Sequence, residues 1–531
     1  MAKLKQPDTL QNLAMNAVIV WLCKTGQNLM TKIAWVARTD AQKSSEYLKE
    51  SVNMIHKLFL YNIPCYLFDN LSKVVFKKLP ILIDNIKRKL KMHASMSEFL
   101  IHVNVAVSLG QIIISPHLHF LNFEEMPKMM RHLFYMRLKD LPGLVYLNLS
   151  TLSGGWKTED MEPIVLNGIV DMKNLHTLIL TYDCTDNILK ILETSCPRIQ
   201  VLDISSSKMI GNNSIKYLLE LHHLKKVQLY RTSITIEGYI RLLTKMPQLE
   251  NIGRYDAIGT CLEYIDMTYE NLDEKPIIKL KVFESHYVVS KHIKLLAKWC
   301  PDIELVCLFH NPLLNDLMGL IAINKLSDLR LLSCNFFQDH VRDVLEVKGC
   351  NLTYLHLEHV EEIDINALMC ISQYCPDLNT LIIYNCELID GPLKYFRKQV
   401  PPFMNLKNLT IAASCTLQHL EFLLMNCFKI KFIHIGTMVP TNDEIFDKIL
   451  ANNPMEYLEE LHIIYSTGLT VSTAYKLLET CENLKVLNEM ESWTRVQEQE
   501  LENFRIFLKI RNYNIDTRPS TWKPQIREEN I

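Results

Sequence analysis

One hydrophobic pattern recurs along most of the chain: an apolar residue, two residues of any kind, a second apolar residue, one residue of any kind, and a third apolar residue. Clear copies are Leu144-x-x-Leu147-x-Leu149 and Leu175-x-x-Leu178-x-Leu180. Other copies begin at Ile199, Leu224, Ile303, Leu329, Leu352, Leu378, Leu406, Ile430 and Leu458, and weaker ones at Leu118, Leu249, Leu280 and Leu484. Consecutive copies begin 23 to 31 residues apart. This period predicts a repeated strand-and-helix unit.

The stretches between these apolar segments predict helices. Ser214 to Leu219 begins with a capping residue and continues with apolar residues spaced near 3.6. The same holds for Asp186–Glu193, Ile236–Leu243, His340–Val347, Asn442–Leu450 and Val471–Leu478. A single strand-helix unit cannot bury its apolar face, so neighbouring units must stack. We therefore expect an α/β fold, a ribonuclease-inhibitor-like leucine-rich repeat solenoid of about 14 to 15 repeats.

Cysteine usage fits this repeat. The chain has 15 cysteines, an odd number, and no pair has the CxxC spacing of a zinc site. Five of them, Cys196, Cys300, Cys375, Cys427 and Cys481, stand three positions before the first apolar residue of a repeat. This resembles the cysteine-containing class of leucine-rich repeats found in intracellular ubiquitin-ligase receptors. We expect these side chains to pack in the bend before each strand, in a reduced protein of the cytoplasm or nucleus.

The repeats do not cover the whole chain. Residues 1–115 predict helices without the repeat, roughly Thr9–Lys24, Asn28–Arg38, Lys43–Phe59 and Tyr66–Met92. We expect the solenoid over residues 116–490, a capping helix over 491–511 and a flexible tail over 512–531. Residues 255–279 form the weakest part of the array, with a loop at Asn271–Pro276.

The predicted N-terminal helices contain two short patterns. The first is Thr9-Leu10-x-x-x-Ala14-x-x-x-Val18. Leu10, Ala14 and Val18 fall on one helix face, which suits a ridge lying in a partner's groove. The pattern resembles the elongin C-binding box of cullin-2 and cullin-5 substrate receptors, although Ala14 stands where Cys is usual. The alternative is that this face packs on neighbouring helices.

The second pattern is Ile63-Pro64-x-x-Leu67-x-x-x-Leu71. It resembles the cullin-2 box, which implies contacts with cullin-2 through Ile63, Pro64, Leu67 and Leu71. Pro64 suits the first turn of a helix because its missing amide would be unsatisfied there anyway. The alternative is an ordinary core helix that begins at a proline.

The order of two boxes and then leucine-rich repeats is similar to the zyg-eleven and zer-one families of cullin-2 receptors, without their armadillo-like domain. This resemblance implies a substrate receptor that binds elongins B and C and cullin-2. The second pattern could instead open an F-box, which would imply a Skp-type adaptor. A non-ligase leucine-rich repeat scaffold or signalling protein is the third possibility.

A protein client would bind the concave face, where the side chains between the apolar positions of each strand project. The predicted central outward residues are Asn148, Ile179, Asp203, Gln228, Cys307, Ser333, His356, Ile382, Thr410, His434 and His462. Aromatic and apolar groups there are candidate hot spots. The client-binding candidates are Phe309, His356, Glu358, Ile382, Tyr384, Phe432 and His434. The alternative is that these groups are merely the exposed residues that any such face carries.

Composition narrows the function further. The net charge of −2 argues against binding to nucleic acid or anionic membrane, and the 15 glycines are too few for Gly-rich phosphate loops. No catalytic motif, metal-ligand set or cofactor-binding motif is present, and no apolar run stands out as a membrane span. The sequence therefore predicts a non-enzymatic protein that binds other proteins.

Overall fold

The structure is a computed structural model that describes residues 4–6, 9–92, 96–124, 126, 128–150, 161–269, 275–309, 314, 317–391 and 403–519. The chain divides into two compact units, Asp8–Leu249 and Glu250–Ile531, the second of which also includes Met1–Pro7. The expected α/β leucine-rich repeat fold is confirmed. The single array expected over 116–490 is divided, because the repeats form two separate sheets.

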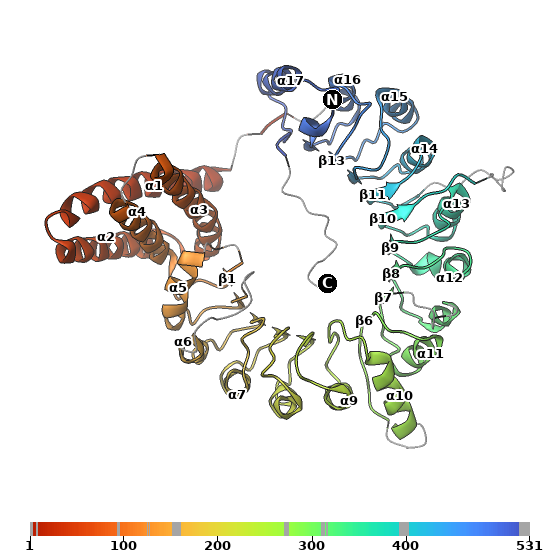
Figure 1. The fold of residues 1–531 in the computed structure, drawn as a ribbon, viewed down its shortest axis with the longest axis horizontal. Coiled ribbons are helices and arrows are strands. Elements are labelled where there is room, and N and C mark those ends of the chain that lie inside the picture. The colour runs from red at the N-terminus through yellow and green to blue at the C-terminus, as the bar shows by residue number, and fades with distance from the viewer. Residues whose placement is uncertain are drawn as a thin grey trace. The chain divides into compact units, whose positions relative to one another are not determined.

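The first unit begins with a helical bundle: α1 Leu10–Ala37, α2 Ala41–Asn62, α3 Phe68–Met92 and α4 Met96–Leu109 (Figure 1). The expected break between Lys24 and Asn28 is wrong, because α1 runs through it. Gly26 is buried there, and a Cβ at this position would lie 2.6 Å from Leu109 Cδ1. The glycine therefore lets the helices approach closely, which outweighs its weak helix propensity.

One stretch of the described chain, Met96–Ile113, is long and apolar enough to cross a membrane by length and composition, although the sequence analysis singled out no such segment. It comprises α4 and the 3₁₀ helix η2 Gly110–Ile113. Its side chains Val105, Ala106 and Leu109 are fully buried, and α4 packs against α1 and α3. A core helix of a bundle has the same features.

The first sheet follows the bundle and has five parallel strands in chain order: β1 Phe120–Asn122, β2 Tyr146–Asn148, β3 Thr177–Ile179, β4 Val201–Asp203 and β5 Lys226–Gln228. The accompanying helices are α5 Lys128–Met136, α6 Met161–Ile169, α7 Asp186–Ser195, α8 Ile215–Leu219 and α9 Ile236–Lys245. The middle apolar residue of each repeat pairs in register with the next, as Leu147 does with Leu178. These side chains are fully buried, so the repeat pattern forms one continuous core row.

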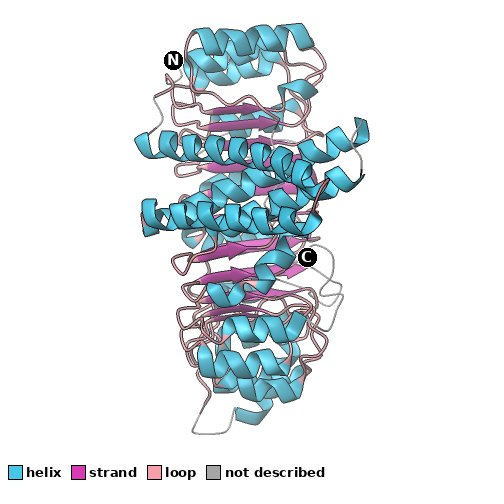
Figure 2. Ribbon diagram, turned by 90° about the vertical axis from the view of Figure 1, so that its left-hand side faces the viewer, coloured by secondary structure: helices cyan, strands magenta, loops and turns pink. Residues whose placement is uncertain are grey.

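The second unit begins its repeats with α10 Ile258–Tyr269 and then has a nine-stranded parallel sheet. Its strands are β6 Val282–Ser285, β7 Leu305–Phe309, β8 Asp328–Leu332, β9 Tyr354–Glu358, β10 Thr380–Glu387, β11 Asn408–Ser414, β12 Phe432–Ile435, β13 Glu460–Ile463 and β14 Val486–Asn488. The helices are α11 Ser290–Trp299, α12 Val341–Lys348, α13 Ile365–Tyr374, α14 Leu417–Met425, α15 Asp443–Asn452, α16 Val471–Thr480 and α17 Glu498–Ile510. Within this unit the strands line the inner side of the curve and the helices the outer side (Figure 1). Figure 2 shows the strands as short arrows, which are parallel to one another within this sheet.

The bend after many strands uses left-handed backbone at a fixed position. Tyr182, Ser206, Arg231, Ser333, His359 and Asn385 each lie two residues after the third apolar residue of a repeat, with φ between 48° and 73°. Non-glycine residues adopt this conformation rarely. The packing of successive repeats therefore imposes the same turn at each of these positions.

The cysteines at the repeat bends are buried as expected. Cys196, Cys300 and Cys375 are C-caps of α7, α11 and α13 and are almost fully buried. Burial raises the pKa of each of these thiols to about 12, so they remain protonated and inert. A small apolar side chain is what the tight bend accommodates.

One repeat was assigned the wrong register from sequence. The copy predicted to begin at Leu329 would read Leu329-x-x-Leu332-x-Cys334. In the structure, however, Leu329 pairs with Val306 and Leu355, which are the middle apolar residues of their repeats. Leu329 is therefore also a middle apolar residue. The correct copy is Leu326-x-x-Leu329-x-Leu331, and Arg330 is its central outward residue. Ser333, expected at that position, is instead the left-handed residue after the strand.

The region assigned to a flexible tail begins with an ordered segment. Asp516 forms a parallel bridge with Val486, donates its backbone N–H to the Lys485 carbonyl (2.7 Å) and accepts from the Leu487 N–H (2.9 Å). Residues 512–519 of the expected tail are described and include this bridge, while 520–531 lie outside the described residues. In the predicted loop at Asn271–Pro276, residues 271–274 also lie outside them. The capping helix, α17, begins at Glu498, seven residues after the predicted start at 491.

Candidate functional site

The first candidate surface is the ridge on α1, formed by Leu10, Ala14 and Val18. Thr9 caps this helix, since its hydroxyl accepts from the Asn12 N–H (3.2 Å). Leu10 is 83% exposed, Ala14 is exposed and Val18 is half-buried. The first buried residue of α1 is Ile19. The ridge is therefore accessible, and the alternative that Leu10 and Ala14 pack on neighbouring helices does not hold within this unit.

Other apolar side chains widen this ridge. Leu13 is 51% exposed and Trp21 is 43% exposed. Leu13 lies one turn from Leu10, and Trp21 lies about one turn beyond Val18. The sequence pattern did not include either residue, although both belong to the same amphipathic helix. The ridge with these two neighbours forms an apolar strip along the first three turns of α1.

The second pattern is only partly at the surface. The structure ends α2 before Ile63 and makes Pro64 the N-cap of the 3₁₀ helix η1 Cys65–Leu67. Pro64 is exposed, and Ile63 and Leu67 are half-buried. Leu71 is fully buried in the first turn of α3, so its side chain is not available here for the predicted contact with cullin-2. A short helix, η1, does begin directly after Pro64, but the Leu71 side chain further along the chain is buried in the core.

A residue inside this pattern has a structural role instead. The Asp69 carboxylate accepts from the backbone N–H groups of His119 (2.8 Å) and Phe120 (3.1 Å), and its other oxygen lies 3.0 Å from His119 Nδ1. It thereby satisfies donors at the outer edge of β1, where no further strand pairs in the described sheet. The segment around Leu71 anchors the bundle to the first array.

The second candidate surface is the outward face of β6–β14. Register places its central row in the order Glu284, Cys307, Arg330, His356, Ile382, Thr410, His434, His462 and Asn488. A parallel row, two residues further along the strands, contains Phe309, Leu332, Glu358 and Tyr384. The structure thus brings together the predicted client residues His356, Ile382, Glu358 and Tyr384 on neighbouring strands.

The other predicted client residues are less accessible or further away. His434 is 1% exposed. Phe432 lies on the same strand, and its ring is 5.3 Å from the ring of His462. Phe309 is half-buried beneath His286, whose ring centroid is 3.4 Å from its own. These three aromatic groups are packed within the face, so their role as free hot spots stays a prediction.

Burial suppresses protonation of the histidines in the central row. It lowers the pKa of His356 to about 4, with a further contribution from the nearby charge of Arg330. It lowers the pKa of His434 to about 3, helped by His462, whose ring centroid is 6.3 Å away. Both rings are neutral at pH 7.

Arg330 lies on this face, and the sequence pattern did not predict it there. Arg330 donates two hydrogen bonds to the Asp328 carboxylate (2.9 and 2.7 Å), and its guanidinium lies 4.8 Å from the ring centre of Tyr354. The wrong register had placed Ser333 at this point of the row. Choosing the copy that begins at Leu326, which the sequence also contains, would have identified Arg330.

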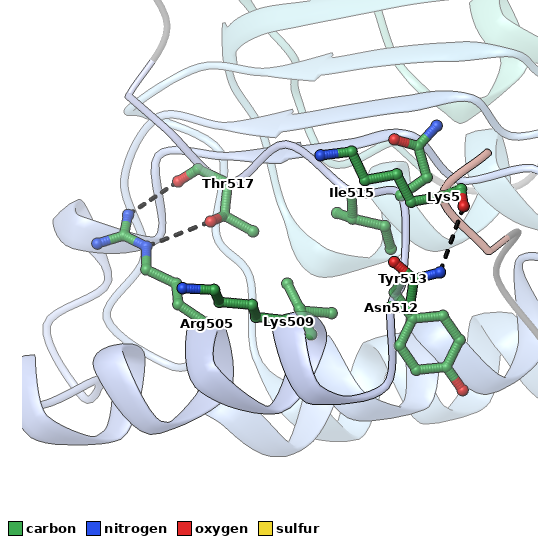
Figure 3. A pocket seen from close by; sticks show the side chains of 9 residues that line it. Lys5, Arg505, Lys509, Asn512, Tyr513, Ile515 and Thr517 are labelled. Atoms are coloured by element: carbon green, nitrogen blue, oxygen red, sulfur yellow. Dashed lines mark hydrogen bonds between the residues drawn. The ribbon is translucent and has the colours of Figure 1, made fainter. Parts of the chain in front are cut away.

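One hollow in the described structure lies beside the last helix of the second array. It has a volume of about 310 Å³ and is lined by Lys5, Arg505, Lys509, Asn512 and Thr517, among others (Figure 3). Arg505 there donates to the Thr517 hydroxyl (3.2 Å) and carbonyl (2.9 Å), and Asn512 donates to the Lys5 carbonyl (3.3 Å). These bonds hold the chain ends together. Among the described residues, no group of three metal-ligating side chains is suitably placed for a metal ion.

Comparisons with known proteins find limited similarity in sequence. No protein-family model matches the chain. A stretch of 141 residues is 25% identical to F-box/LRR-repeat protein 4 of Bos taurus, covering 26% of this chain and 22% of that protein.

Solved structures with similar architecture share little sequence. An internalin from Listeria monocytogenes is 14% identical over 73% of this chain and 90% of its own (TM-score 0.33), and the Leptospira interrogans LRR protein LIC12759 is 14% identical over 76% and 95% (TM-score 0.36). A chain of the yeast Rad7 and Elc1 complex is 13% identical over 93% and 96% (TM-score 0.38). The repeated strand-helix units and their parallel register make this chain an α/β leucine-rich repeat protein.

Proposed function

We propose that the chain is a non-catalytic substrate receptor of a cullin-RING ubiquitin ligase, acting in the cytoplasm or nucleus. In this proposal, α1 binds the elongin B/C adaptor, and the outward face of β6–β14 binds a protein client. The accessible ridge of Leu10, Ala14 and Val18 carries the proposal, because it combines the resemblance to an elongin C-binding box with surface exposure.

The physical basis is the gain from burying this ridge. Full burial of one leucine side chain contributes about 2 kcal/mol, and small followers such as Ala14 let the helix lie deep in a groove. Leu13 and Trp21 add apolar area beside the ridge. Thr9 caps the helix and orders its first turn without help from neighbouring helices.

Cullin-2 is the proposed cullin, with a smaller set of contacts than the resemblance implied. Ile63, Pro64 and Leu67 remain the candidate contacts, and Leu71 is excluded by its burial. Tyr61 and Tyr66, 86% and 72% exposed, flank Pro64 and enlarge this surface. Exposed tyrosines are common anchors in protein interfaces.

The test is recovery of purified elongins B and C by the full-length chain. We expect Leu10→Asp to weaken binding at least tenfold, since a buried charge in the groove would be unpaired. Met54→Asp is the matched control: Met54 is 69% exposed on α2, outside the ridge, and should leave binding unchanged. Absence of elongin binding by the unmodified chain would refute the adaptor assignment.

An F-box type receptor is the second candidate, favoured by the 25% identity to a protein named F-box/LRR-repeat protein 4. It predicts binding of a Skp-type adaptor in place of the elongins. Binding of neither adaptor would favour a leucine-rich repeat scaffold outside ubiquitin ligases. The same purified-component assay separates all three.

A further inference from the structure

The outward face of β6–β14 contains one acidic residue whose surroundings suit a particular ligand group. Glu358 ends β9, and register places it between Leu332 of β8 and Tyr384 of β10. Its side chain is 16% exposed. A carboxylate this buried ordinarily has a cation beside it, because removing its charge from water is costly.

No such cation is present among the described residues. The one ionisable group within 4 Å of the Glu358 carboxylate is His356, with Nε2 at 3.5 Å from Oε2. Burial makes His356 neutral at pH 7 by lowering its pKa to about 4. Burial also raises the pKa of Glu358, and the nearby charge of His359 opposes this shift only in part. Arg330 is near, but its guanidinium is bound to Asp328 through two hydrogen bonds.

His356 supplies a second, independent observation. Its side chain is 8% exposed, and Nε2 is buried without a hydrogen-bond partner in the described structure. An unsatisfied buried nitrogen costs about 1 to 3 kcal/mol. Nε2 and the Glu358 carboxylate therefore lie 3.5 Å apart without a hydrogen bond between them, so the neutral ring does not compensate the charge of the carboxylate.

We propose that Glu358 and Tyr384, beside the neutral His356, bind an arginine side chain of the client. A guanidinium presents several N–H donors in one plane, so it can donate two parallel hydrogen bonds to the Glu358 carboxylate. The ring of Tyr384, adjacent to Glu358 in register, provides an aromatic surface on which this plane can stack. An ammonium group has donors but no plane to stack.

The wider face favours the same ligand charge. Its outward rows contain four carboxylates, Glu284, Asp328, Glu358 and Glu460, against the single guanidinium of Arg330. A negative face attracts basic segments and accelerates their encounter. Among these basic segments, Glu358 then favours those that present a guanidinium, which fits the carboxylate and the neighbouring tyrosine ring. This inference rests on the client-binding part of the proposed function and does not require the adaptor.

The test is a selection of random 12-residue peptides by mRNA display on the full-length chain. We expect enriched peptides to share an arginine at one position. Selection on Glu358→Gln should lose this preference, and selection on Glu387→Gln should keep it, because Glu387 is exposed and lies three residues beyond Tyr384. Equal melting temperatures of the three proteins would exclude a folding defect.

Anisotropy titrations with one enriched peptide sharpen the test. Replacing its arginine by lysine or by uncharged citrulline should weaken binding at least tenfold, as should Glu358→Gln. An absent arginine preference, a preference retained by Glu358→Gln, or equal binding of the lysine peptide would each overturn the proposal. Leu10→Asp should retain the arginine preference, so failure of the adaptor assignment and failure of this inference remain distinguishable.

Discussion

The two arrays use their outward polar residues differently. In the first, the side chains of Asn122, Asn148 and Asp203 turn back and accept the backbone N–H two residues further on, at 3.0, 2.8 and 2.9 Å. Each such bond terminates a strand of three residues. In the second array, the strands β7 to β11 are five to eight residues long, and the central row carries larger side chains that remain on the face.

This difference separates structural from available polar groups. A side chain bound to its own backbone has little capacity left for a ligand, so the first array is largely self-satisfied along its central row. The second retains, among the described residues, a buried histidine nitrogen without a hydrogen-bond partner and a partly buried carboxylate 3.5 Å from it. Buried polar groups are normally satisfied, so exceptions of this kind mark candidate binding sites.

The two arrays also protect their outer edges differently. A side chain, Asp69 of α3, caps the edge of β1. A backbone segment around Asp516 pairs with the edge of β14. Both devices satisfy edge groups that would otherwise be available to another chain.

Among the variants that test this comparison, we expect the largest effect from replacing Asp69, the side chain that caps the edge of β1. Asp69→Ala would leave the N–H groups of His119 and Phe120 without their charged acceptor, and we expect the free energy of unfolding to fall by about 3 kcal/mol. Chemical denaturation measures this loss. Asp69→Asn, which keeps an acceptor but not the charge, should lose roughly half as much. An unchanged midpoint for Asp69→Ala would contradict a capping role.

The next effect concerns acid stability of the second array. His434 has a folded pKa of about 3 and an unfolded pKa near 6.5, so the unfolded chain binds more protons between these values. The contribution of neutral His434 to the free energy of unfolding is therefore fully present above pH 6.5 and is lost as the pH falls toward 3. Because of His434 alone, the free energy of unfolding should be lower by about 2 kcal/mol at pH 5 than at neutral pH.

Denaturation at pH 7 and pH 5 measures this contribution. His434→Gln should reduce the loss on acidification, whereas His222→Gln should not, because His222 is 75% exposed in the first array. Identical pH dependence of all three proteins would show that His434 does not titrate as its burial implies.

The smallest expected effect distinguishes the two central rows directly. Asn148→Ala removes the acceptor of the Ser150 N–H at a site that is 2% exposed, and should cost about 1 to 2 kcal/mol. Thr410→Val, in the equivalent row of the second array, removes a hydroxyl that is not used in a turn and should cost under about 0.5 kcal/mol. Thermal melting of the two variants provides the comparison, and equal losses would remove the distinction between the rows.

Sequence periodicity predicted the repeated strand-helix unit, most of its helices and the buried bend cysteines, because these follow from local spacing and composition. It failed where local spacing allowed two solutions. Both Leu326 and Leu329 begin an acceptable copy of the pattern, and lateral pairing of Leu329 with Val306 and Leu355 decides between them. A register shift of three residues was enough to hide Arg330.

The N-terminal patterns show the same limit. Leu10 and Leu71 occupy comparable positions in two sequence motifs, yet one is 83% exposed and the other fully buried. A helix pattern defines which residues share a face, but it does not define what covers that face. The fold buries Leu71 in α3, which packs against α1 and α4, whereas the first buried residue of α1 is Ile19.

The sequence by itself determined that this protein is built from stacked leucine-rich repeats preceded by helices, since a recurring apolar spacing can be buried only by stacking identical units. The tertiary structure decided three further points: the division into two arrays, the exposure of the α1 ridge, and the grouping of His356, Glu358 and Tyr384. These depend on which strands and helices lie side by side. Such contacts join residues far apart in the chain, and no local spacing encodes them.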